Sequence, residues 1–318
     1  MPAHRGRRSI RDIESLRREA ALDAIDCRSI AGKKVYVFES HNLALIPWAE
    51  CRRSLNLKPR LFTLDFHTDT RPAFIGAAVA RSAKLGPGPD EWQPIAQELV
   101  DAIQFRDPGS VAEAAIRLRY DEQIDAAVRA GILDVAFVAA HSDQGHIESD
   151  QQLAADIEWR ANPCRLSREI ASGPYTYTLP ESRLVVLPHL LLPTGRLDSN
   201  GIRGDDYDRD YRDAAIEDGR LCQPIALVNT ICKDAEIPGL YEIPYILDID
   251  LDYFNTKRSI APRSSTIFYE LISRAEIITV AKETACVRQC RLQGEKVTSS
   301  SLEKSLMRHI ERAMEPQS

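Results

Sequence analysis

Short apolar runs, rich in β-branched and aromatic residues, recur along the chain between polar turns. Six of them are Lys34–Phe38, Arg60–Leu64, Leu133–Ala139, Arg183–Leu187, Tyr245–Leu251 and Glu276–Ala281. Their apolar positions are nearly continuous rather than alternating with polar ones, which is typical of strands buried on both faces. The pattern therefore predicts strands from the interior of a sheet.

Helix-length amphipathic segments lie between these runs and at the two ends of the chain. They are Ile10–Ile25, Leu43–Leu55, Asp90–Ile103, Gly109–Ala130, Ser264–Arg274 and Ser300–Glu315. Alternation of strands and helices predicts an α/β protein in three layers, α/β/α, with helices on both faces of a mostly parallel central sheet.

The chain reads as one main domain. Its 318 residues suit a single large α/β unit, and neither repeats nor a linker are evident. We expect an N-terminal helical extension over residues 1–30 and one domain over residues 31–318. Loops are predicted at Leu85–Asp90, which contains two Gly-Pro pairs, and at the aspartate-rich stretch Gly195–Asp213.

Composition narrows the function classes. The net charge of −6 argues against a nucleic-acid partner, because phosphates demand clustered positive charge, but suits a cationic substrate. Seven scattered cysteines without a C-x-x-C pair argue against a zinc ribbon and favour reduced thiols in the cytoplasm. The apolar run Leu184–Pro193 is too short to span a membrane. Homo-oligomerisation is left open.

Polar residues gather where four of the predicted strands end. The four clusters are Glu39–Asn42, Asp65–Asp69, His141–His146 and Asp248–Asp252. They hold four of the seven histidines in the chain. In open α/β sheets ligands bind beyond the carboxyl ends of the strands, so these clusters predict a functional site.

Two of the clusters have the spacing of metal ligands. Asp65, His67 and Asp69 alternate, so in an extended segment all three face one side. Mixed carboxylate and imidazole ligands suit a divalent cation of the manganese, iron or zinc group. By itself this motif is more often a capped loop than a metal site.

The aspartates 248, 250 and 252 repeat the alternation with carboxylates alone. Such a row repels itself unless a cation neutralises it, and it directly follows an apolar strand. Together with His41 the ligands suffice for two metals that share carboxylates. Paired metals can share one hydroxide and aim it at a substrate carbon.

In these ligand motifs the chain resembles the arginase and agmatinase family of ureohydrolases. That family carries Gly-Gly-Asp-His-Ser, Asp-Ala-His-x-Asp and Asp-x-Asp-x-x-Asp-Pro motifs in this order, followed by a glutamate on a short stretch after a late strand. The counterparts here are Ser40–Ala44, Asp65–Asp69, the run from Asp248, and Val280–Thr284. The four pieces span most of the chain.

The resemblance implies an arginase-like fold, two Mn²⁺ ions and a set of roles. The implied metal ligands are His41, Asp65, His67, Asp69, Asp248 and Asp250, with the pair Asp250 and Asp252 as the second choice of register. Glu283 would pair with the guanidinium of the substrate. Asp252 or a neighbouring aspartate would carry a proton to the leaving amine, and His141 or His146 would relay protons with solvent.

Departures from the family concern the grip on a free amino acid. Arg71 stands where arginases have an asparagine that holds the α-carboxylate; it is a candidate substrate contact or a surface ion pair. The run Asp-Ile-Asp-Leu-Asp-Tyr-Phe is similar to that of uncharacterised arginase-like proteins whose relatives include peptide arginases. The resemblance thus implies conversion of peptidyl-arginine to peptidyl-ornithine and urea. Aspartates between residues 205 and 213 would attract a cationic peptide.

Two other functions remain open. A deacetylase-like amide hydrolase of the same fold typically uses zinc and a tandem His-His pair, which this sequence lacks. A non-catalytic, metal-stabilised binding protein would keep the ligands and tolerate replacement of Glu283. A metallophosphoesterase is disfavoured, because its Gly-Asn-His-Asp/Glu motif is missing.

Overall fold

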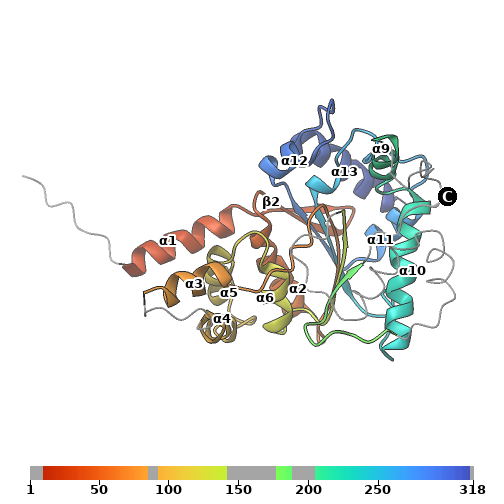
Figure 1. Cartoon of the computed structure of the whole chain (residues 1–318). Helices are drawn as coiled ribbons and strands as arrows, with labels where there is room; N and C mark the ends of the chain where they lie inside the picture. The colour runs from red at the N-terminus through yellow and green to blue at the C-terminus, as the bar shows by residue number, and fades with distance from the viewer. Residues whose placement is uncertain (1–9, 85–91, 142–176, 188–204, 316–318) are drawn as a thin grey trace, which may run out of the picture.

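The computed structural model describes residues 10–84, 92–141, 177–187 and 205–315 (Figure 1). Its centre is a seven-stranded sheet in the order β1-β2-β7-β6-β3-β4-β5. The strands are β1 Asp26–Ile30, β2 Lys33–Phe38, β3 Arg60–Asp65, β4 Ala136–Ala140, β5 Leu184–Leu187, β6 Tyr245–Asp250 and β7 Ile277–Ala281. All six predicted strands are present, each within three residues of its expected start.

The six neighbouring strands β2, β7, β6, β3, β4 and β5 run parallel to one another, and a mostly parallel sheet is what the sequence predicted. Among the strands that the structure describes, only β1 is antiparallel; it forms a hairpin with β2 through Ala31 and Gly32, both at positive φ. This edge strand was not predicted, because its residues Asp-Cys-Arg-Ser-Ile are mostly polar and largely exposed. The segment interpreted as a helical extension therefore also supplies a strand to the sheet.

Helices cover both faces of the sheet, which makes the α/β class and its layered arrangement plain (Figure 1). One face carries α2 Leu45–Ser54, α5 Pro108–Arg117 and α6 Gln123–Arg129, and the other carries α10 Asp218–Asp234, α11 Thr266–Arg274 and α13 Ser299–Ala313. Side chains alternate between the two cores: Phe62 and Leu64 of β3 face one, and Leu61 faces the other.

Seven further elements complete the described part of the chain. They are α1 Ile10–Asp23, the 3₁₀ turn η1 His41–Ala44, α3 Ile75–Ser82, α4 Trp92–Asp101, α9 Asp205–Asp213, the 3₁₀ turn η2 Leu251–Tyr253, and α12 Thr284–Cys290. Helix α1 packs against α5. No helix among the described residues is long and apolar enough to cross a membrane.

Two predictions about secondary structure were wrong in part. The segment Gly109–Ala130 is two helices, because the chain turns at 118–122 and the buried Glu122 accepts backbone N–H groups from Phe74, Gly76 and Arg119. Residues 205–213 of the expected acidic loop form α9. Its Tyr211 is buried under the guanidinium of Arg220, so packing overrides the low helix propensity of aspartate. The predicted loop Leu85–Asp90 lies outside the described residues.

Candidate metal centre and active site

The predicted ligands converge because their strands are neighbours. The parallel strands β2, β7, β6 and β3 lie side by side, so their carboxyl ends form one edge of the sheet. His41 follows β2, Asp65 ends β3, Asp250 ends β6, and Glu283 follows β7. Residues far apart in the sequence thus meet at one point, as is usual for sites in open α/β sheets.

His41 is the centre of this group and is fully buried. Its Nε2 lies 2.8 Å from Oδ2 of Asp248. Its Nδ1 lies 2.8 Å from Asp69, 3.4 Å from Asp250 and 3.6 Å from Asp65, measured to a carboxylate oxygen in each case. None of these three contacts has the geometry of a hydrogen bond, and both Nδ1 of His41 and Oδ2 of Asp65 are buried without a hydrogen-bond partner.

This arrangement fits a cation. When Nε2 carries the proton that Asp248 accepts, Nδ1 presents a lone pair to three carboxylate groups. A lone pair among carboxylates is repelled, and unpaired buried polar atoms are costly, unless a positive ion lies between them. His41, Asp65 and Asp250 bring one ligand atom each within 4.8 Å of one another. The donor set itself therefore supports a metal at this position.

A second buried histidine shows how an ordinary structural imidazole looks in this protein. Nε2 of His309 lies 2.8 Å from the carbonyl of Ile260, and Nδ1 lies 3.1 Å from the hydroxyl of Tyr269. Both ring nitrogens are paired with protein groups, and burial lowers the pKa of His309. His41 differs because one nitrogen faces only carboxylates.

Asp248 supports His41 rather than joining the ligand group. It lies in register with Thr63 on β3 and Thr279 on β7. The Thr63 hydroxyl donates to its Oδ2 at 2.8 Å and the Thr279 hydroxyl to its Oδ1 at 2.5 Å. Trp48 in turn donates to the Thr279 hydroxyl at 3.1 Å. Both oxygens of Asp248 are thus engaged, in the manner of a carboxylate that orients a metal-binding histidine.

The geometry therefore favours the second of the two registers, Asp250 with Asp252, over Asp248 with Asp250.

We expect Asp248→Asn to weaken metal binding by roughly 10- to 100-fold, because an amide nitrogen facing Nε2 of His41 would disturb the tautomer that leaves Nδ1 free. Titration calorimetry with Mn²⁺ measures this. Asp101→Asn, at an exposed position on α4, is the matched control. Unchanged affinity in Asp248→Asn would refute the supporting role.

A second group of candidate ligands lies beside the first. Nδ1 of His67 is 3.1 Å from Oδ2 of Asp252, and the thiol of Cys290 is 3.8 Å from the same oxygen. Asp65 lies between the groups: its Oδ2 faces His41 at 3.6 Å and its Oδ1 lies 3.9 Å from His67 Nδ1. The two groups are thus adjacent, which is the arrangement that a paired metal centre requires.

Hydrogen bonds from the surrounding chain fix the carboxylates. Asp65 accepts from the backbone N–H of His67, Asp252 accepts from that of Phe66, and Asp250 accepts from that of Asp252. Asp69 has a left-handed backbone, with φ of 49°, which aspartate tolerates better than most residues. The turned backbone brings its carboxylate to His41.

Burial and like charge govern the electrostatics of this cluster. Burial first, and then the neighbouring carboxylates, raise the pKa of Asp65 and Asp250 well above the usual range. Burial alone lowers the pKa of His41, but Asp248 and the other carboxylates raise it above its ordinary value. Without a cation the cluster thus holds on to protons.

Glu283 stands at the border of the cluster. Its backbone is left-handed, with φ of 30°, a conformation that strains a glutamate and is held by the N–H bond to the carbonyl of Glu39. Its Oε1 accepts from the backbone N–H of His41 at 3.1 Å. Burial raises the pKa of Glu283. The carboxylate therefore lies next to the first group of candidate ligands, on a residue that is half-buried.

The other predicted residues have different surroundings. The ring of His141 stacks on Tyr253 at 4.2 Å, and its Nε2 lies 3.1 Å from the Tyr253 carbonyl. Arg71 is exposed and forms an ion pair with Asp121 at 3.2 Å, which is the surface contact foreseen as its alternative role. His146 lies outside the described residues.

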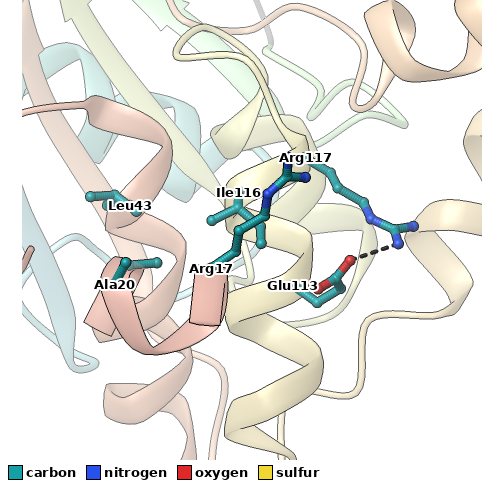
Figure 2. A pocket seen from close by; sticks show the side chains of 7 residues that line it. Arg17, Ala20, Leu43, Glu113, Ile116 and Arg117 are labelled. Carbon is teal, nitrogen blue, oxygen red and sulfur yellow. Dashed lines mark ion pairs between the residues drawn. The ribbon is translucent and has the colours of Figure 1, made fainter. Parts of the chain in front are cut away.

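A cavity of about 410 Å³ lies elsewhere, between α1 and α5 (Figure 2). Figure 2 shows Arg17 and Ala20 of α1 facing Ile116 of α5, with Arg117 turned to its ion-pair partner Glu113 at 2.6 Å. None of the ligand residues lines it. The cavity is therefore separate from the candidate site.

Two features of the site were not predicted from the sequence. One is the supporting role of Asp248, which depends on cross-strand neighbours. The other is Cys290, whose spacing from Cys286 places both on one face of a helix that begins just after Glu283. That i, i+4 spacing was the available signal, but it is also common in helices that bind nothing.

Comparison of the chain with models of protein families, with curated proteins and with solved structures finds no match. Function must therefore be inferred from the site itself.

Proposed function

We propose that this chain is a hydrolase with a paired divalent-metal centre and that it cleaves a guanidino group. One observation carries the proposal: the buried Nδ1 of His41 faces carboxylates of Asp65, Asp69 and Asp250 without a hydrogen-bond partner. The adjacent pair His67 and Asp252 and the neighbouring Glu283 are consistent with such a centre. The arginase-like fold belongs to the same proposal.

The ligands divide into two sets. His41, Asp69 and Asp250 would hold one cation, His67 and Asp252 would hold the other, and Asp65 lies between them. Carboxylate-rich sets suit Mn²⁺, although other divalent metals also accept these ligands. Such paired cations lower the pKa of water enough to supply a hydroxide nucleophile near neutral pH. In this assignment Asp252 is a ligand rather than the proton carrier expected from the sequence.

Glu283 gives the proposal its substrate class. Its carboxylate borders the candidate ligands and the residue is only half-buried, so a planar guanidinium could make bidentate contact with it. Burial raises the pKa of Glu283, and a bound cationic group would favour its charged form. The contact would hold the guanidinium carbon close to the metal ligands.

Arginine within a peptide is the specific substrate that we propose. Arg71 stands at the position where arginases have a residue that binds the α-carboxylate of free arginine. Here its side chain pairs instead with Asp121. A peptide-bound arginine has no such carboxylate and needs no such grip. The products would be peptidyl-ornithine and urea.

Replacing Glu283 by glutamine should lower kcat/KM for a guanidino substrate by roughly 30- to 3,000-fold, as expected when one partner of a partly buried charge pair is lost. Metal content and unfolding temperature should stay unchanged, because Glu283 is not assigned as a ligand. Glu276→Gln, an exposed site just before β7 at the opposite end of that strand, is the matched control. Normal turnover by Glu283→Gln would show that another group binds the guanidinium.

Urea release tests the function as a whole. The Mn²⁺-loaded protein would be offered free arginine, agmatine and short arginine-containing peptides. We expect urea from the peptides and little from free arginine. Urea from a free compound alone would refute the peptide substrate. If metal binds but no substrate yields urea, the deacetylase-like or non-catalytic function replaces this one.

A further inference from the structure

We propose that the thiol of Cys290 is a third protein ligand, with His67 and Asp252, for one cation of the pair. That position would then combine nitrogen, oxygen and sulfur, and would take Zn²⁺, Co²⁺ or Fe²⁺ in preference to Mn²⁺. The inference rests on the proposed metal centre, but it concerns a residue and a metal preference that the arginase resemblance does not supply.

The three ligand atoms have suitable separations. His67 Nδ1 and Cys290 Sγ lie 3.1 Å and 3.8 Å from Oδ2 of Asp252, and all three atoms are within 4.8 Å of one another. A tetrahedral ion at about 2.0–2.2 Å from nitrogen and oxygen and about 2.3 Å from sulfur would place its ligands roughly 3.3–3.7 Å apart. Only small movements would therefore bring the three atoms onto one ion.

The fold holds Cys290 at this place. It is the last residue of α12, which packs against η2, the turn that carries Asp252. Val287 of the same helix is buried in the protein core. Asn255 joins the two segments, because its carbonyl accepts from the N–H of Leu292 and its side-chain amide donates to the carbonyl of Asp252. The cysteine is thus positioned by packing on both of its sides.

Other described cysteines provide contrast. Cys27 and Cys222 are exposed, and Cys51 and Cys232 are buried in the two apolar cores. Cys286 lies one turn before Cys290 on the same helix but faces Glu283. Among the described residues, only Cys290 joins two further ligand-type side chains.

A sulfur ligand would make the two metal positions chemically different. Thiolates favour zinc and other softer ions, whereas carboxylate-rich sets favour Mn²⁺. The group around His41 offers only nitrogen and oxygen, and the group around Cys290 adds sulfur. Binding of the ion there would release the thiol proton to solvent.

Cobalt spectroscopy of the full chain tests the inference. Addition of Co²⁺ to wild-type protein should produce a near-ultraviolet thiolate-to-cobalt charge-transfer band. Cys290→Ser should lose that band while still binding Co²⁺ at the other position, and Cys286→Ser should keep it. A band of wild-type strength in Cys290→Ser would overturn the inference.

The outcomes separate this inference from the function on which it rests. Co²⁺ that binds to wild-type protein without the band would refute the thiolate ligand and leave the paired centre standing. No Co²⁺ binding would refute both. If Cys290→Ser fails to fold, alkylation of the wild-type protein decides: Zn²⁺ should protect Cys290 but not the exposed Cys222, and equal labelling of Cys290 with and without Zn²⁺ would overturn the inference.

Discussion

Asp250→Asn is expected to lower hydrolytic activity by about 10³-fold or more and, at the same time, to stabilise the metal-free protein. The loss follows because a cation at such a centre contributes several kcal/mol to the transition state, and each 1.4 kcal/mol is a factor of about ten. The gain follows from the surroundings of the side chain. Its Oδ1 accepts from the N–H of Asp252, and its Oδ2 faces Nδ1 of His41 at 3.4 Å.

An asparagine at position 250 can keep the first contact and removes a carboxylate from the cluster. Its carbonyl can still accept from the N–H of Asp252. Burial and the neighbouring carboxylates raise the pKa of Asp250, so a charged carboxylate is unfavourable at this position without metal. Its removal should raise the free energy of unfolding of the metal-free protein by about 1–3 kcal/mol. Urea denaturation in chelator, beside a urea-release assay with metal, measures both effects.

The exposed Asp101→Asn variant should change neither quantity. A metal-free Asp250→Asn protein that is less stable than wild type would indicate that the carboxylate serves the fold. An active variant would show that Asp250 is not a ligand.

Removal of metal is expected to lower the unfolding temperature by roughly 10 °C. This decrease should be larger at pH 8 than at pH 6. A cation present at about 1,000 times its Kd stabilises the folded state by about 4 kcal/mol, and each kcal/mol shifts Tm by about 2–4 °C in proteins somewhat smaller than this one. The pH dependence comes from groups that hold protons in the folded, metal-free state.

The sign of that dependence is the same for each shifted ligand group. Burial and neighbouring carboxylates raise the pKa of Asp65 and Asp250, so the folded protein binds protons that the unfolded chain releases. The pKa of His41 is raised too: burial lowers it, but the surrounding carboxylates more than compensate. Stability of the metal-free protein therefore falls as the pH rises through these folded-state pKa values.

Differential scanning calorimetry of chelated and Mn²⁺-loaded protein at several pH values checks this expectation. The cation displaces the protons, so the gap between the two unfolding temperatures should widen with pH. Identical unfolding temperatures at every pH would mean that no metal binds this cluster.

The sequence predicted the core of the fold well because strands buried on both faces have a simple signature. Every near-continuous apolar run became a strand, and parallel pairing placed their polar ends at one edge. Its failures lie where tertiary contacts decide. The strand β1 is polar and largely exposed, and the aspartate-rich α9 is held by tertiary contacts, among them the burial of Tyr211.

The candidate ligands could be named from their spacing in the sequence, but the different role of each aspartate could not. Asp248 and Asp250 alternate correctly, yet Asp248 faces hydroxyl groups on both neighbouring strands, and Asp252 lies on a 3₁₀ turn beyond the strand end. Cross-strand register is a property of the sheet, so one strand taken alone does not reveal which aspartate faces the hydroxyl groups and which joins the candidate ligands. Cys290 reaches the site only through the packing of α12.

Anomalous diffraction from crystals grown with Mn²⁺ tests the central claim most directly. We predict two anomalous peaks at the carboxyl edge of the sheet, one in contact with Nδ1 of His41 and the other in contact with Nδ1 of His67, with Asp65 between them. Crystals that show His41 Nδ1 paired with a protein group and no peak beside it would contradict the account.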